Sequence, residues 1–562
     1  MLANYEKVVL DRATYRFNLF DLFSIHVLIV TDDEVSYGVA DGSNVGTHQF
    51  SLLEVVRALT HPPGGAPWIK VTKAHRRVDP MGVNTSVGWV TPADIEHFTF
   101  SAASLAGFDQ VWLFGAEFGG GGPSLSPAEV QALTHFMNGG GGVFATGDHV
   151  DLGVTLCGAI PRVRSMRRWY FPNPGPLGEP VAPDPVSAAR HDTTRENPPG
   201  QYPFDNQSDV IPMVIVPTYW PFIFWRYPHP LLCGHQGVID VMPDHMHEGD
   251  VMTPTGTDSA SGWTGGSVPG GLGTTLNING ELIVEYPTLA GHQESPVIVA
   301  QADVIGGHIT PSSEMHTGST TPTVAQRFAC IGAYDGFRSG VGRVAVDSTW
   351  HHFFDLNLVG DPSAPTPKNQ GFNATAAGQD VLARIENYFV NIATWLTPNK
   401  GYFLLGWLVA VLRAAATREL IPLTPVMNDR FVLQVGDAVY ADLLRFLPPC
   451  AILDFVIWVY REVAVEWPLP HLPNPPDPWA TGQKAVAVNP ENWAAAALGG
   501  MAVEVEHALY KQGELKGRAV QTLMHRGMVK GLTLYAQVQA EQSRDTLRDA
   551  EAMLAGFRGK EK

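Results

Sequence analysis

The first ~150 residues alternate strand-like and helical patterns, and this alternation restricts the fold more than any other feature of the chain. Strand-like apolar runs cover 24–30, 68–71, 109–114 and 142–146, and helical spacing covers 50–59. A helix start is expected at Thr91-Pro92-Ala93-Asp94, and Ser126-Pro127-Ala128-Glu129 forms a capping box that opens a second helix. Because strands that alternate with helices need right-handed crossovers, we expect an α/β fold with a mostly parallel sheet.

Further strand patterns follow, separated by two long polar stretches. The strand-like runs are 210–216, 219–225, 282–286, 297–304 and 343–346. The stretch 171–208 is rich in Pro, Asn, Asp and Arg, and 253–275 is rich in Gly, Ser and Thr. We interpret both as loop insertions, the first as either an ordered insertion or a mobile lid, because plain connections are rarely so long.

The character of the chain changes after about residue 360. We expect an α/β domain over 1–370, an apolar helical region over 371–467, a Pro-rich linker over 468–483 and a C-terminal helical segment over 484–562. The longest apolar runs, 402–412 and 451–460, are shorter than the ~20 residues that span a bilayer. We therefore expect no transmembrane segment and interpret these runs as buried helices.

The charge of the chain excludes one broad class of function. The 562 residues contain 37 Lys and Arg against 55 Asp and Glu, a net charge of −18, so we expect no nucleic-acid partner. Only 16% of the residues are charged, against ~25% in an average globular chain, which leaves apolar surface available for a partner protein or for a homo-oligomer.

Cysteine usage and the N-terminus indicate the compartment. The four cysteines lie far apart and form no C-x-x-C pair, so a disulfide scaffold and a zinc ribbon are both excluded. The N-terminus has no apolar core of a signal peptide. We expect reduced thiols in a cytoplasmic protein.

Acids and imidazoles follow several of the predicted strands. Because ligands of open parallel sheets bind beyond the carboxyl ends of the strands, these side chains are the candidate site. His and carboxylate groups together allow acid–base chemistry or metal binding. We assign catalytic roles to Asp148, His149, Glu248, His351 and His352, and substrate-binding roles to Asp32, Glu117, Arg162, Arg164 and Trp350.

Two of these interpretations leave alternatives open. His245 and His247 share one side of an extended segment, so with His149 and His351 they could hold a divalent metal such as zinc, or they could belong to a polar loop without a ligand. Arg162 and Arg164 could bind an anionic group of a substrate or form internal salt bridges with the surplus carboxylates.

Residues ~22–360 resemble the ThuA-like branch of the class I glutamine amidotransferase-like superfamily. The resemblance rests on FDQVWLFG followed by GGGVFATGDH, on HPLLCGHQGVIDVMPDHMHEGD, and on GRVAVDSTWHHFF. It implies a flavodoxin-like α/β domain and a site at His149, at 244–248 and at His351 or His352. It departs from the family at the elbow, where Thr146-Gly147-Asp148-His149 stands in place of the nucleophilic cysteine, so glutamine amidotransferase activity is not expected.

Two functions from different classes fit these observations. The first is an enzyme that acts on a small polar substrate, such as a carbohydrate derivative, by His/carboxylate acid–base or metal-assisted chemistry. The second is a non-catalytic protein in which the α/β fold binds a ligand or serves assembly, with the C-terminal helices as the interaction surface. The missing nucleophile and the long apolar helical region favour the second, and the polar residues at the strand ends favour the first.

Overall fold

The computed structural model of the chain contains two compact units. The first consists of Met1–Tyr219 and Pro228–Asn399, and the second of Trp220–Tyr227 and Lys400–Lys562. The residues described are 24–38, 50–62, 69–77, 93–117, 125–149, 151–169, 191–195, 210–222, 225–234, 237–252, 271–289, 291, 293–309, 320–361, 364–397, 429–444, 452–456, 459, 490–512 and 517–558. The first unit extends beyond residue 370 and includes a helix that the sequence analysis grouped with the following region.

A mixed sheet of nine strands forms the centre of the first unit in the described residues. Its order is β11-β6-β15-β16-β17-β4-β3-β1-β2. The bounds are β1 Ile25–Thr31, β2 Ile69–His75, β3 Gln110–Phe114, β4 Gly142–Thr146, β6 Met213–Pro217, β11 Val241–Met242, β15 Val297–Val304, β16 Gln326–Tyr334 and β17 Val344–Asp347. The strands β2, β1, β3, β4 and β17 run parallel, and the pairs from β17 through β16, β15 and β6 to β11 are antiparallel.

The expected α/β class is confirmed. The strand expected at 282–286 is present as β14 Glu281–Val284, which pairs with β13 in a separate hairpin. Strand β16 was not predicted. The helix start expected at residues 91–94 is wrong over its described part, since 93–100 contain no helix and α3 Ala102–Leu105 begins later with its own capping box on Ser101. The residues of 171–208 other than 191–195, and those of 253–270, lie outside the described part.

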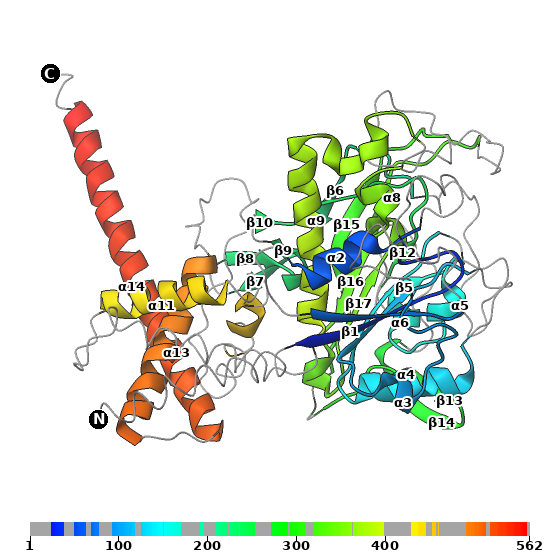
Figure 1. The fold of residues 1–562 in the computed structure, drawn as a ribbon. Coiled ribbons are helices and arrows are strands. Elements are labelled where there is room, and N and C mark those ends of the chain that lie inside the picture. The colour runs from blue at the N-terminus through cyan, green and yellow to red at the C-terminus, as the bar shows by residue number, and fades with distance from the viewer. Residues whose placement is uncertain are drawn as a thin grey trace. The chain divides into compact units, whose positions relative to one another are not determined.

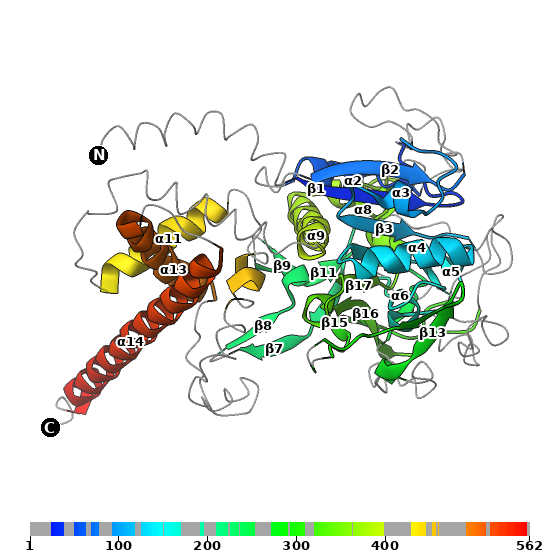
Figure 2. The same cartoon turned by 90° about the horizontal axis from the view of Figure 1, so that it is seen from below.

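Helices cover both faces of the sheet (Figures 1 and 2). On one face α2 Leu53–Thr60 and α9 Ala376–Trp395 share a core with Val27 and Ile29 of β1. On the other face α4 Pro127–Asn138 packs with Leu28 and Val30 of the same strand. Alternate residues of a strand point to opposite faces, so a continuous apolar run such as that of β1 is required where both faces are buried.

Short elements complete the first unit. The helices are α5 Val154–Cys157, α6 Val163–Met166, α8 Asp355–Leu358, η1 Pro230–Leu232, η2 Gly271–Gly273, η3 Gly336–Ser339, η4 Trp350–His352 and η5 Lys368–Ala374. Two-stranded pairs are β5 Arg167–Arg168 with β12 Asp250–Val251, β9 Cys233–Gly234 with β10 Gly237–Val238, and β13 Thr275–Ile278 with β14 Glu281–Val284. The segment between β11 and β12 carries His245 and His247, and the η4 turn carries His351 and His352.

The second unit contains the hairpin of β7 Tyr219–Phe222 and β8 Trp225–Pro228 except for its end residues Tyr219 and Pro228, which belong to the first unit. It also contains the helices α11 Asp429–Leu443, α13 Pro490–Gln512 and α14 Gly517–Arg558. Glycines let these helices approach closely, because a Cβ at Gly500 would overlap the backbone of Gly527 and one at Gly436 would overlap that of Ala495. None of the described helices has the length and apolar character needed to cross a membrane. The predicted linker 468–483 lies outside the described residues.

Replacing Phe389 with alanine is expected to destabilise the first unit by about 3–5 kcal/mol. The Phe389 ring is fully buried on α9 and stacks on Phe353 at a centroid distance of 5.1 Å, so its removal leaves a cavity beneath the η4 turn. Chemical denaturation followed by fluorescence measures the loss. Leu282→Ala is the matched control, since 73% of Leu282 is exposed and a change within about 0.5 kcal/mol is expected there.

Candidate metal centre

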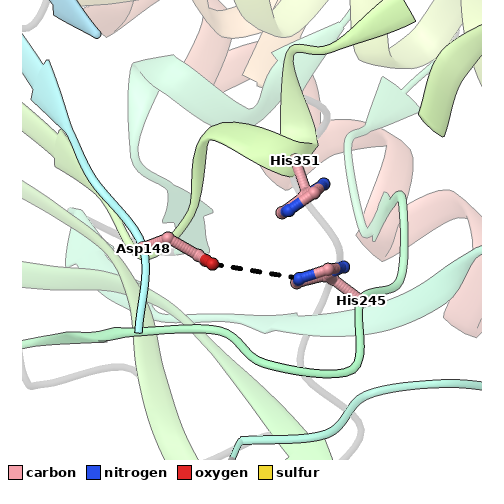
Figure 3. Close-up of side chains that lie close together, drawn as sticks. All are labelled: Asp148, His245 and His351. Atoms are coloured by element: carbon pink, nitrogen blue, oxygen red, sulfur yellow. Dashed lines mark ion pairs between the residues drawn. The ribbon is translucent and has the colours of Figure 1, made fainter. Parts of the chain in front are cut away.

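Three buried side chains from separate segments converge at the carboxyl edge of the sheet (Figure 3). Asp148 follows β4, His351 lies in the η4 turn after β17, and His245 lies between β11 and β12. One potential ligand atom from each lies within 4.8 Å of the other two. Parallel neighbours β4 and β17 end at the same edge, which brings Asp148 and His351 together.

The two imidazoles of this group lie face to face. The rings of His245 and His351 are stacked with centroids 3.4 Å apart and an angle of 20° between their planes. Burial lowers the pKa of His351 to about 4, and it also places the pKa of His245 well below its usual value, where the neighbouring imidazoles lower it further. Both rings are therefore neutral near pH 7 and keep the lone pair that a metal ligand needs.

A hydrogen bond orients the His351 ring. Its Nδ1 lies 2.8 Å from Oδ1 of Asn357 in α8, so Nδ1 donates the hydrogen and the lone pair remains on Nε2. Metal-binding histidines commonly have such a partner on their other nitrogen. Asn357 thus fixes the tautomer that His351 would need.

Several polar atoms of the group have no hydrogen-bond partner among the described residues. They are Oδ1 of Asp148 and both ring nitrogens of His245, although Nε2 of His245 lies 3.9 Å from Oδ2 of Asp148. Leaving a buried polar group unsatisfied costs about 1–3 kcal/mol. A cation would satisfy the Asp148 carboxylate and one ring nitrogen of His245 at once, and two imidazoles with one carboxylate are a donor set that binds zinc. This buried group could therefore hold a metal ion.

Other predicted residues surround the group. His149 places Nδ1 2.6 Å from Oδ2 of Asp148, and 23% of its side chain is exposed. Its ring lies 4.8 Å from that of His247, which in turn lies 6.0 Å from the His245 ring. Of the four histidines expected to bind a metal, the structure places His245 and His351 in the central group and His149 and His247 beside it.

His352 has different hydrogen-bond partners from its neighbour His351. Its Nδ1 lies 2.7 Å from Oδ1 of Asp347, and its Nε2 lies 3.5 Å from Oε2 of Glu248. Burial alone would lower the pKa of His352, but the carboxylates of Asp347 and Glu248 raise it. Burial raises the pKa of Glu248 to about 7, and its carboxylate accepts hydrogen bonds from Thr193 and Ser348. Neither side chain is exposed.

Arg167 holds the backbone around the site, a role that the sequence analysis did not identify. Its fully buried guanidinium donates hydrogen bonds to the carbonyl oxygens of Asp148 at 2.7 Å, Ser348 at 2.6 Å and Asp250 at 3.0 Å. A Cβ at Gly249 would overlap this guanidinium. The only sequence signal was the basic cluster around Arg162, which does not distinguish a buried arginine from exposed ones.

The residues expected to bind substrate lie apart from the central group or are covered. Arg164 forms a buried ion pair with Glu285 at 2.9 Å, and the Arg162 guanidinium donates to Asn138. The Arg164 contact follows the internal salt-bridge alternative, whereas the Asn138 partner of the Arg162 guanidinium is a neutral amide. Trp350 is buried, and its ring contacts His351 at a centroid distance of 4.9 Å.

Asp32 and Glu117 lie at the ends of β1 and β3, where the order of the parallel strands reverses. Oδ1 of Asp32 accepts a hydrogen bond from the backbone N–H of Ala116 at 2.6 Å. Glu117 forms an ion pair with Arg77 at 2.7 Å. Burial raises the pKa of Asp32 to about 7, so this carboxyl retains its proton over most of the acidic range.

Asp32→Asn is expected to change how stability depends on pH. Since folding raises the pKa of Asp32 from 3.8 to about 7, the folded state holds its proton more tightly than the unfolded state. Wild-type stability therefore falls as pH rises from about 4 to 7, by at most about 4 kcal/mol from this group. The variant lacks this pH-dependent component. We therefore expect its free energy of unfolding, relative to that of the wild type, to be higher at pH 8 than at pH 5, as measured by urea denaturation.

Asp33→Asn is the matched control, because Asp33 is the exposed neighbour and its left-handed backbone suits asparagine. A pH profile of Asp32→Asn that parallels those of the wild type and of Asp33→Asn would contradict the assignment.

No protein-family model, no curated protein and no solved structure matches this chain. The resemblance to the ThuA-like branch thus stays a prediction, and what can be said of function depends on the geometry of the site.

Proposed function

We propose that the first unit is a zinc-dependent hydrolase of small polar, carbohydrate-derived substrates, with the ion held by Asp148, His245 and His351. The observation that carries the proposal is the convergence of these three buried side chains, with ligand atoms within 4.8 Å of one another. Their donor set, two imidazoles and a carboxylate, leaves a fourth position open for water or substrate, as in catalytic zinc sites.

The chemistry follows from that open position. A zinc ion in such a site lowers the pKa of bound water to about 7 and polarises a carbonyl group. Bound zinc would supply the water nucleophile for hydrolysis, and the leaving group would need a proton from a nearby side chain as its bond breaks. His149 is suited to transfer this proton, because its side chain is partly exposed and its Nδ1 is held by Asp148.

The same proposal includes the fold family. The parallel strands follow the order β2-β1-β3-β4-β17, which matches the flavodoxin-like order 2-1-3-4-5 when β17 takes the fifth position. This order supports a flavodoxin-like, ThuA-like domain in which the elbow cysteine is replaced by Asp148 and His149. A ligand of the ion at the elbow would then take the place of the nucleophile.

Loss of either imidazole ligand is expected to remove the ion. Purified wild-type protein should bind about one zinc ion per chain, and His245→Ala and His351→Ala should each lower the affinity at least about 100-fold, since even outer partners of zinc ligands contribute 10–100-fold. Elemental analysis and calorimetric titration measure both quantities. His135→Ala is the control, because His135 is exposed and pairs with Glu281. Wild-type protein that binds no zinc, or variants that bind it normally, would refute the centre.

His149→Ala should separate catalysis from binding. The variant is expected to retain zinc stoichiometry, because Asp148, His245 and His351 remain, and to lose hydrolysis by about 10²–10⁴-fold. Rates are measured on a panel of small carbohydrate-derived esters and amides. Zinc-loaded wild type that hydrolyses none of them would instead favour the non-catalytic alternative of a ligand-binding protein.

A further inference from the structure

A short segment from the predicted 171–208 insertion lies directly against the backbone of His245. The hydroxyl of Thr193 accepts a hydrogen bond from the His245 N–H at 3.0 Å, and the Thr193 N–H donates to the His245 carbonyl at 2.9 Å. Thr193 is buried. One residue of the insertion therefore fixes both backbone polar groups of a proposed zinc ligand.

Glu248 anchors this threonine. The Thr193 hydroxyl donates to Oε1 of Glu248 at 2.6 Å, and Ser348 donates to Oε2 at 2.9 Å. Ser348 directly follows β17, and the η4 turn that carries His351 begins two residues later. Glu248 thus joins the segment of one ligand to the segment of the other.

The network continues into the core. His352 lies between Glu248 and Asp347, with nitrogen–oxygen distances of 3.5 and 2.7 Å. Tyr388 of α9 donates to the second oxygen of Asp347 at 2.8 Å. The support of His245 therefore reaches the helix that covers the sheet, and every side chain in this path is buried.

We infer that Thr193 and Glu248 are positioning residues that hold His245 at the distance from Asp148 and His351 that a bound ion requires. Neither is placed among the ligands, and Glu248, expected from the sequence to be catalytic, acts here through Thr193. The inference rests on the proposed zinc centre. Outer partners that fix a metal ligand typically contribute 10–100-fold to metal affinity.

The test compares two substitutions at one position in the full chain. Thr193→Val keeps the shape of the side chain and removes the hydroxyl, whereas Thr193→Ser keeps the hydroxyl and removes the methyl group. The probe is Co²⁺, whose visible absorption reports both affinity and coordination geometry. We expect Thr193→Val to bind Co²⁺ 10–100-fold more weakly with an altered spectrum, and Thr193→Ser to bind within about threefold of the wild type.

Thermal melting of the metal-free variants controls for a purely structural role, because general loosening would lower the melting temperature without changing the spectrum of bound Co²⁺. If Thr193→Val does not fold, Glu248→Gln decides the question. The Glu248→Gln side chain has nearly the same volume but carries an amide N–H₂ in place of one accepting oxygen. We expect this variant to bind Co²⁺ 10–100-fold more weakly with an altered spectrum, as for Thr193→Val.

The outcomes distinguish the two proposals. Wild-type protein that fails to bind Co²⁺ and Zn²⁺ would overturn the zinc centre and this inference with it. Wild-type binding together with unchanged affinity and spectrum in Thr193→Val, or in Glu248→Gln where that variant is used, would overturn the positioning role alone.

Discussion

One buried guanidinium sets the geometry at the carboxyl edge of the sheet. Arg167 donates to carbonyl oxygens that follow β4, follow β17 and lie in β12, so a single charge joins three segments that are distant in sequence. Removing a guanidinium from water is costly, and these three hydrogen bonds offset part of that cost. Burial lowers the pKa of Arg167, but nearby carboxylates, with Asp148 first among them, act in the opposite direction. Asp148 is thus held through its carbonyl oxygen while its carboxylate faces the histidines.

Local sequence patterns predict where many of the strands and helices lie, but they do not predict the direction in which each strand runs. The runs that became β1, β3 and β4 are apolar and bounded by turns, and the Ser126 capping box forms as expected. Parallel and antiparallel strands buried on both faces look alike in sequence, however, because direction depends on which strand each one pairs with. The antiparallel pairs from β17 to β11 were therefore not foreseen. Strand β16 was not predicted because its first residues, Gln326 and Arg327, are polar and interrupt the apolar pattern.

The site could be anticipated only where it follows the sheet. Asp148 and His351 come after parallel neighbours, and the rule that such strands end at one edge brings them together. His245 follows the edge strand β11, whose position no local pattern reveals. His351 and His352 are the same residue type at adjacent positions, so the sequence does not distinguish their roles. In the folded chain His351 stacks on His245, whereas His352 contacts Asp347 and Glu248. Asn357 and Thr193 have no distinguishing motif, since their roles depend on contacts made only in the folded chain.

The spread of Asp148, His245 and His351 along the chain has a consequence for biosynthesis. A nascent polypeptide that has emerged only as far as β15 has the carboxylate and one imidazole but lacks the η4 turn, β16 and β17. Its sheet would still lack the strand that pairs with β4 on the side where His351 belongs. The group of Asp148, His245 and His351 is therefore complete only after β17 and the η4 turn have joined the sheet, so nearly two-thirds of the chain must be made before its last member is in place.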